Sequence, residues 1–110
     1  MMLGEKQELF TRCLIELLLI MHNRGFQVRM GQVERSVEEA TRLGKPNSVH
    51  TLRLAADLHL FQGGVYLQNT ADHAPFGGFW ESLNELCRWG GRFRPIADGN
   101  HYSIEHEGVR

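Results

Sequence analysis

The sequence lacks the residues that define several common protein classes. Its two cysteines, Cys13 and Cys87, are too few for a disulfide framework or for a zinc finger built from thiolates. Neither sign of charge dominates, because 12 lysines and arginines stand against 13 aspartates and glutamates, so no overall field favours nucleic acid or an anionic membrane as a partner. Repeats, low-complexity tracts and linkers rich in proline and glycine are also missing. We therefore expect one domain over residues 1–110.

A long hydrophobic run is missing as well. The most apolar stretch, residues 14–21, is interrupted by Glu16 and is far shorter than the ~20 residues that a membrane span requires. Glu5 and Glu8 precede it and no small-residue cleavage site follows, so it does not resemble a secretory signal. We expect a chain that is made in the cytoplasm without a signal peptide and does not insert into a membrane. Work outside the membrane would need a separate release route.

The remaining composition is that of an ordinary globular protein with several histidines. Of the 110 residues, 42% are apolar and 23% are charged, which is enough for one hydrophobic core and unlike a disordered tail. Six histidines accompany the two cysteines. A metal in this chain would therefore be held by imidazole and carboxylate groups rather than by thiolates.

Hydrophobic periodicity predicts a mixture of helices and strands. The expected helices cover residues 5–23, 36–43 and 76–88, and the expected strands cover residues 26–30, 52–61, 65–67 and 101–105. The first helix is apolar almost all round, which favours a largely buried helix. No βαβ rhythm is present, so we predict an α+β fold in which helices pack on a small antiparallel sheet.

The first candidate site joins His50 to Asp57. These residues are seven positions apart, and because side chains alternate along a strand they cannot share a face of one continuous strand. His50 must therefore lie at or before a bend, from which it can fold back toward Asp57. The alternative is a loop histidine beside a solvated strand aspartate.

The second candidate site is the turn from Asp98 to His101. Gly99 and Asn100 permit a tight turn that lets the two outer side chains converge. Two histidines and one carboxylate would leave a fourth zinc position for water, which is typical of a hydrolytic site. Jointly, the two clusters could supply three ligands and a carboxylate base, with a nearby cation stabilising an oxyanion. The alternative is a hydrophilic turn with no further role.

These segments carry a family resemblance. Residues 48–57 read Ser-x-His-x-x-x-x-Ala-x-Asp, which resembles the Ser-x-His-x-x-Gly-x-Ala-x-Asp signature of zinc D-alanyl-D-alanine carboxypeptidases and phage endolysin peptidases. Residues 98–101 read Asp-x-x-His and resemble the later Asp/Glu-x-x-His element of that family. Residues 31–36 are similar to its Gly-x-Arg-Ser segment, with extra residues before the arginine. The resemblance runs from about residue 26 to residue 110.

The resemblance implies a role for five residues. His50, Asp57 and His101 would bind Zn²⁺. Asp98 would be the base that takes a proton from the attacking water, and Arg35 would bind the substrate carbonyl or carboxylate and stabilise the oxyanion. The implied fold is the small α+β Hedgehog/DD-peptidase fold, with the site on an antiparallel sheet.

The implied function is cleavage of peptidoglycan stem peptides by a monomeric catalytic domain. Short phage members of the family are mostly L-alanyl-D-glutamate endopeptidases used in host lysis, and this is the function that we predict. Two alternatives stay open. One is a D-alanyl-D-alanine carboxypeptidase that trims stem peptides, and the other is a catalytically silent binding module stabilised by zinc.

One position departs from the signature and four histidines lie outside it. Arg53 stands where the signature has glycine, so we expect the backbone there not to use a positive φ, and we expect a reshaped substrate groove. We interpret His22 and His73 as surface or capping residues. His59 shares the strand face of Asp57 but is left out of the metal set, and His106 is interpreted as a solvated histidine near the chain end.

Overall fold

The computed structural model describes all residues from 1 to 110 and confirms the α+β fold. Its helices are α1 (Leu3–Asn23), α2 (Val37–Arg42) and α3 (Thr70–Leu83), with short 3₁₀ helices η1 (Val49–Leu52) and η2 (Gly90–Arg92). Its strands are β1 (Gln27–Met30), β2 (Ala55–Gln62), β3 (Val65–Leu67), β4 (Cys87–Trp89) and β5 (His101–Ile104). None of the helices combines the length and the apolar character needed to cross a membrane.

The strands form one antiparallel sheet around β2. The strand order is β1-β2-β5-β4, and β3 also pairs with β2. Strand β1 takes one edge of β2, while the other edge is shared by β5 at the start of β2 and by β3 at its end. In the β2–β5 ladder Asp57 lies opposite His101, so the sheet register itself joins two residues that are far apart in the sequence.

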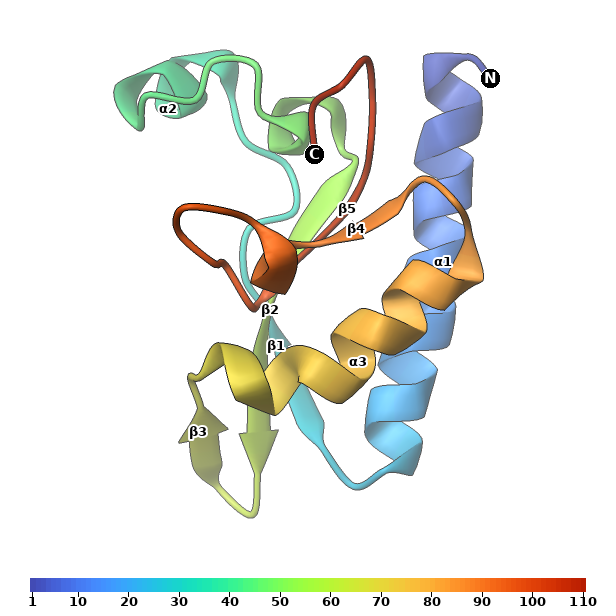
Figure 1. Cartoon of the computed structure of the whole chain (residues 1–110), viewed down its shortest axis with the longest axis vertical. Helices are drawn as coiled ribbons and strands as arrows, with labels where there is room; N and C mark the ends of the chain where they lie inside the picture. The colour runs from blue at the N-terminus through green and yellow to red at the C-terminus, as the bar shows by residue number, and fades with distance from the viewer.

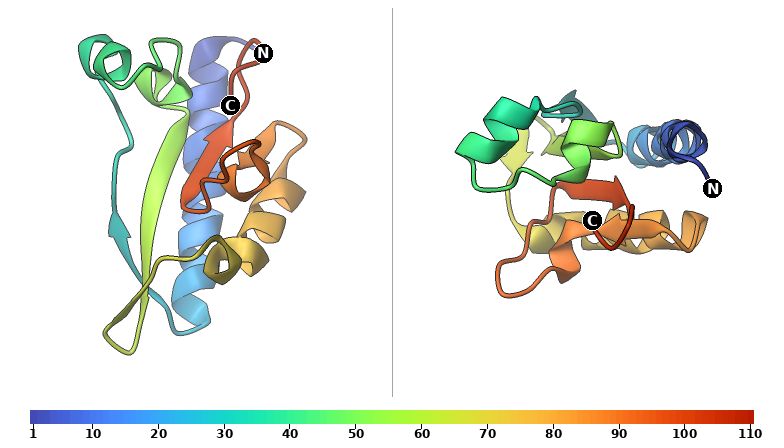
Figure 2. Two further views of the ribbon diagram at one scale, coloured as in Figure 1. Left: turned by 60° about the vertical axis from the view of Figure 1, so that its left-hand side comes forward. Right: turned by 90° about the horizontal axis from the view of Figure 1, so that it is seen from above.

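Helices α1 and α3 lie together against one face of this sheet (Figures 1 and 2). Trp80 of α3 is fully buried between the rings of Phe10 and Tyr102, with centroids 5.8 Å and 5.9 Å away. The thiols of Cys13 and Cys87 are free and buried in the same core, with their sulfur atoms 4.0 Å apart. The core therefore occupies one side of the sheet and leaves the other side for a site.

Helix α1 has the predicted bounds within two residues, but the prediction that it is largely buried is wrong. Leu17 and Met21 are fully buried, whereas Ile15 and Leu19 are 60% and 57% exposed. The helix lies at the outside of the layer, so only one stripe of it reaches the core. Arg24 ends the helix and Gly25 follows with a φ of 86°, as the predicted glycine stop requires.

The prediction of a helix over residues 76–88 is wrong at both ends. Helix α3 begins six residues earlier, at Thr70, where the Asn69 amide donates to the Asp72 carboxylate at 3.0 Å. Pro75 lies inside the helix and removes one backbone donor without ending it. At the other end, Asn84 is extended and accepts a hydrogen bond from the Cys87 amide, which turns the chain into β4.

The long central strand also starts later than predicted. Residues 49–52 form η1 and the strand begins at Ala55. The Leu54 amide still donates to the Val49 carbonyl at 3.0 Å, so the turn of η1 closes before the ladder of β2 begins. The bend that we predicted before Asp57 is thus the 3₁₀ turn η1, and it contains His50.

Candidate metal centre

The 3₁₀ turn η1 fixes the position of His50. The Ser48 hydroxyl accepts a hydrogen bond from the His50 amide at 3.2 Å and caps the turn. The His50 ring is 3% exposed, and its Nδ1 lies 3.2 Å from the Val33 carbonyl oxygen. A backbone carbonyl accepts only from a protonated nitrogen, so Nδ1 carries a hydrogen, and Nε2 is the ring nitrogen that faces Asp57.

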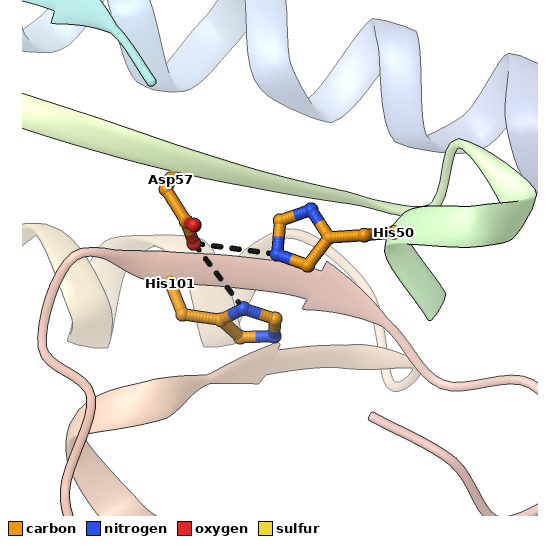
Figure 3. Close-up of side chains that lie close together, drawn as sticks. All are labelled: His50, Asp57 and His101. Carbon is orange, nitrogen blue, oxygen red and sulfur yellow. Dashed lines mark ion pairs between the residues drawn. The ribbon is translucent and has the colours of Figure 1, made fainter. Parts of the chain in front are cut away.

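The sheet brings Asp57 and His101 to the same place. They are directly opposite each other in the β2–β5 ladder, and the His50 ring folds back from η1 to meet them. Figure 3 shows the three side chains pointing toward one another from η1, β2 and β5. The structure therefore joins the three residues that the family resemblance implies as metal ligands.

The distances from Asp57 to the two histidines fit two ligands of one metal ion better than they fit hydrogen bonds, and the ligand atoms of all three residues lie within 4.8 Å of one another. Oδ1 of Asp57 lies 3.4 Å from Nε2 of His50 and 3.5 Å from Nδ1 of His101. Good hydrogen bonds between such groups are shorter, near ~2.8 Å. Two ligands of a tetrahedral Zn²⁺, each at ~2.0–2.1 Å from the ion, are about 3.3 Å apart. The observed distances match this second value.

The polar atoms of the cluster are also incompletely paired within the protein. Oδ1 of Asp57, the oxygen that faces both histidine rings, is buried without a hydrogen-bond partner. Such groups are costly unless another partner completes them. Burial raises the pKa of the Asp57 carboxyl, but the His101 and His50 rings more than offset this and hold it below its usual range. The carboxylate form that a cation needs is thereby favoured, so the donor set fits Zn²⁺.

Arg35 and Asp98 lie at the same cavity as the two histidines. The cavity has a volume of about 790 Å³, and His50, His101, Arg35 and Asp98 all line it. The family resemblance implied one site for these four side chains, and all four line this cavity. An ion at the three-residue cluster would therefore face a cavity large enough for a short peptide, with a carboxylate and a guanidinium at its wall.

Arg35 is held in place by the segment that passes the site. Its Nε and Nη2 donate to Oε1 of Gln32 at 2.9 Å and 2.7 Å, and its backbone amide donates to the His50 carbonyl at 3.1 Å. Gln32 in turn accepts a backbone hydrogen bond from the Asp57 amide. Because no carboxylate pairs with Arg35, its charge is available to a bound ligand.

Asp98 is positioned by the turn before β5. Its carbonyl accepts from the His101 amide at 3.1 Å, and its amide donates to the Gly90 carbonyl at 2.8 Å. The Trp89 indole donates to the Gly99 carbonyl at 2.7 Å and anchors the middle of the turn. The carboxylate of Asp98 has no partner within the protein and lies half-buried at the cavity wall. It is therefore free to exchange a proton with a ligand.

The other histidines lie outside the cluster, but the interpretation of His73 is wrong. His73 is 2% exposed, and its Nδ1 lies 2.7 Å from the Tyr102 hydroxyl in the core. It was misplaced because helix α3 begins earlier than predicted. His59 binds the Tyr66 hydroxyl at 2.9 Å. His106 is half-buried beside Lys6 rather than fully solvated.

The expectation for the backbone at Arg53 is also wrong. Arg53 has φ 58° and ψ 39°, which is the left-handed conformation that the signature glycine would adopt at no steric cost. Its amide donates to the His50 carbonyl and so closes the end of η1. The turn geometry is therefore kept at the cost of strain in an arginine. The Arg53 side chain points to solvent and lies 3.3 Å from Glu34.

Several groups at the site gave little or no signal in the sequence. The Val33 carbonyl that orients His50 is a backbone group, so no residue type could reveal it. Gln32 is three residues before Arg35, a spacing that is common by chance. Lys45 and Arg110 line the cavity from segments outside the family motifs. Their side-chain charge was visible, but their position depends on the tertiary fold.

Comparison with known proteins places the fold. No protein-family model matches the chain, and no curated protein matches its sequence. Among solved structures, the L-Ala D-Glu endopeptidase ChiX of Serratia marcescens matches with a TM-score of 0.60 at 20% identity. The fold is shared with this endopeptidase. The match covers 71% of this chain and 66% of that chain, slightly less than two thirds of the endopeptidase.

Proposed function

We propose that this chain is a zinc-dependent peptidase that cleaves peptidoglycan stem peptides. The observation that carries the proposal is the cavity shared by the three-residue cluster, a free carboxylate and an unpaired guanidinium. The fold shared with an L-Ala D-Glu endopeptidase adds support. The same bond, between L-alanine and D-glutamate, is the one that we propose for this chain.

His50, Asp57 and His101 would hold the ion. When bound in such a site, Zn²⁺ supplies Lewis acidity that polarises a carbonyl and makes water more acidic. Asp98 takes a proton from the attacking water on its free carboxylate and returns it to the leaving amine. Arg35, held by Gln32, donates to the substrate oxygen on which negative charge develops.

The test is digestion of purified peptidoglycan, followed by mass spectrometry of the products. Wild-type protein should release fragments cut between L-alanine and D-glutamate. Asp98→Asn should keep one equivalent of zinc and lose cleavage by at least ~100-fold, because the base is lost while the ligands remain. Glu107→Gln makes the same chemical change at an exposed position and should cleave normally.

The other outcomes separate the alternatives. Release of terminal D-alanine alone would replace the endopeptidase with a carboxypeptidase. Zinc binding without any product from wild-type protein would favour a silent binding module. Wild-type protein that binds no zinc would overturn the proposal entirely.

We also propose a role in host lysis, in which the enzyme acts on the cell wall after release from the cytoplasm. The support is the family resemblance of residues 48–57 and 98–101. Expression of the protein with and without a membrane-permeabilising agent tests this role. Lysis should require the agent, and lysis without it would contradict release as the controlling step.

A further inference from the structure

The cavity beside the metal cluster has a strong excess of positive charge. Arg35, Lys45, Arg94 and Arg110 line it, and Asp98 is the single acidic residue among its lining residues. Among the lining side chains, four positive charges less one negative charge leave three, although the side chains of the whole chain sum to a net charge of −1. The excess is therefore a local property of this cavity.

The protein does not neutralise these four cations. Arg94 donates to backbone carbonyls of Gly91 and Phe93, and Arg110 lies 4.5 Å from the centre of the Phe93 ring. No carboxylate pairs with either of them or with Lys45 or Arg35. Outside the cavity four arginines each face a glutamate (Arg42, Arg53, Arg88 and Arg92), and four further cations have no carboxylate partner but do not line this cavity: Lys6, Arg12, Arg24 and Arg29. Unpaired cations collected in one cavity indicate an anionic ligand.

The cations come from two walls. Arg35 and Lys45 flank helix α2, whereas Arg94 and Arg110 belong to the loop after η2 and to the last residues of the chain. Helix α2 and the loop before β5 lie on the same side of the molecule, away from α1 (Figure 1). His50 lines the cavity from the first side and His101 from the second. A ligand at the metal cluster thus meets a cation from each wall.

We propose that Lys45 and Arg94 are specificity-determining residues that each bind a different carboxylate of an acidic peptide. This inference rests on the proposed function, because it assigns the substrate contacts of the same cavity. A peptide fits better than a nucleic acid, since the cations surround a bounded cavity rather than forming a stripe. Phe93 is also the only aromatic residue of the lining, which leaves few surfaces on which bases could stack.

The size of the effect follows from exposure. Lys45 and Arg94 are exposed side chains, so salt screens their interaction with a ligand. A charge-assisted contact of this kind is expected to contribute about tenfold in affinity at low salt. Removing a carboxylate from the peptide should therefore lower the affinity by the same factor as removing its cation from the protein. Making both changes together should lower the affinity little more than either change alone.

The experiment measures binding, so that it does not depend on turnover. The probe is a synthetic stem tetrapeptide with two free carboxylates, on D-glutamate and at the C-terminus, together with two versions in which one carboxylate is an amide. Calorimetric titration uses the zinc-loaded Asp98→Asn protein. We expect each amide to weaken binding about tenfold. Lys45→Gln should abolish the sensitivity to one amide, and Arg94→Gln the sensitivity to the other.

Arg92→Gln is the matched control, because it removes the same charge from an arginine that pairs with Glu81 outside the cavity lining. It should leave affinity within about twofold of the parent protein. Equal binding of acidic and amidated peptides would overturn the inference. So would an equal loss from Arg92→Gln and Arg94→Gln, or tighter binding of a single-stranded oligonucleotide than of the tetrapeptide.

The two proposals fail separately. Cleavage of both acidic and amidated peptides at the same kcat/KM would support the peptidase and contradict the carboxylate contacts. If the binding data follow the predicted pattern but wild-type protein cleaves nothing, the carboxylate contacts are supported and the peptidase is contradicted.

Discussion

Two regions of the molecule bury imidazole rings, and they do so in opposite ways. On one side of the sheet, His50 and His101 face one oxygen of Asp57 at 3.4 Å and 3.5 Å. On the core side, His73 contacts the Tyr102 hydroxyl at 2.7 Å. His101 and Tyr102 are neighbours in β5, so a single strand serves both regions with its alternating faces.

The difference shows that burial alone does not mark a ligand. His101 and His73 are 5% and 2% exposed, so exposure does not separate them. What separates them is the partner. In the core, the Tyr102 hydroxyl is the hydrogen-bond partner of a neutral ring. At the metal cluster, one negatively charged carboxylate oxygen faces two rings, and a cation could bind to all three groups. The first arrangement is structural and the second is suited to a metal.

Zinc affinity gives the largest expected difference between the two regions. His101→Ala removes one of three ligands and should weaken zinc binding by about 1000-fold, or about 4 kcal/mol. His73→Gln should bind zinc as wild-type protein does, because its ring lies in the core. Competition with a chromophoric chelator measures both affinities, and circular dichroism checks that both variants fold. An equal loss of zinc affinity in the two variants would contradict the distinction between a metal-binding His101 and a structural His73.

The sequence allowed the metal side to be predicted better than the core side. His50, Asp57 and His101 stood out because their side chains can bind a metal, and above all because residues 48–57 and 98–101 resemble the family signature. The strand period also required a bend between the first two. Their convergence also depends on the β2–β5 register, which tertiary pairing sets. The position of His73 depended only on where helix α3 begins, and propensity alone places helix ends poorly.

The sheet shows the same division. The hairpin of β2 and β3 was predictable from alternation and from Gly63 and Gly64, which both adopt a positive φ. The first two residues of strand β4, Cys87 and Arg88, were predicted as helix, because a three-residue strand is too short to show alternation and its neighbours fit a helical spacing. Its strand identity comes from pairing with β5, a contact that no local pattern contains.

Acid should destabilise the core region through His73. Burial lowers the pKa of His73 to about 4, below its ordinary value of 6.5. Protonation therefore favours the unfolded chain, so the stability from the neutral ring is complete above pH 6.5 and is lost as the pH falls toward 4. The loss is on the order of 3 kcal/mol. Urea unfolding at pH 7.5 and 4.5 measures it.

His73→Gln is the variant that isolates this effect. It lacks the titrating ring, so its free energy of unfolding should fall less than that of wild-type protein over the same pH interval. Both proteins are measured without metal, so that loss of zinc in acid does not contribute. The same pH dependence in both proteins would show that other groups, and not His73, set the acid response.

Adding even one methyl group at Gly90 should destabilise the protein, because the backbone at Gly90 packs closely against Asp98 and His101. A Cβ at this position would collide with the Asp98 carbonyl oxygen and lie 2.8 Å from Cβ of His101. Gly90→Ala should cost about 1–3 kcal/mol of stability and displace the turn that holds Asp98. Gly78→Ala is the control, because no atom lies within 4 Å of its added Cβ. Thermal unfolding measures both, and equal stabilities would contradict the tight contact.

The smallest expected effect tests the strain beside His50. Arg53 adopts a φ of 58°, which costs an ordinary residue about 1–2 kcal/mol, and part of this is regained because glycine loses more entropy on folding. Arg53→Gly should therefore raise the free energy of unfolding by up to about 1 kcal/mol. Its exposed contact with Glu34 contributes little. Urea unfolding measures the change, with Arg53→Ala as a control that keeps the strain. Glycine no more stable than alanine at this position would mean that η1 holds His50 without strain.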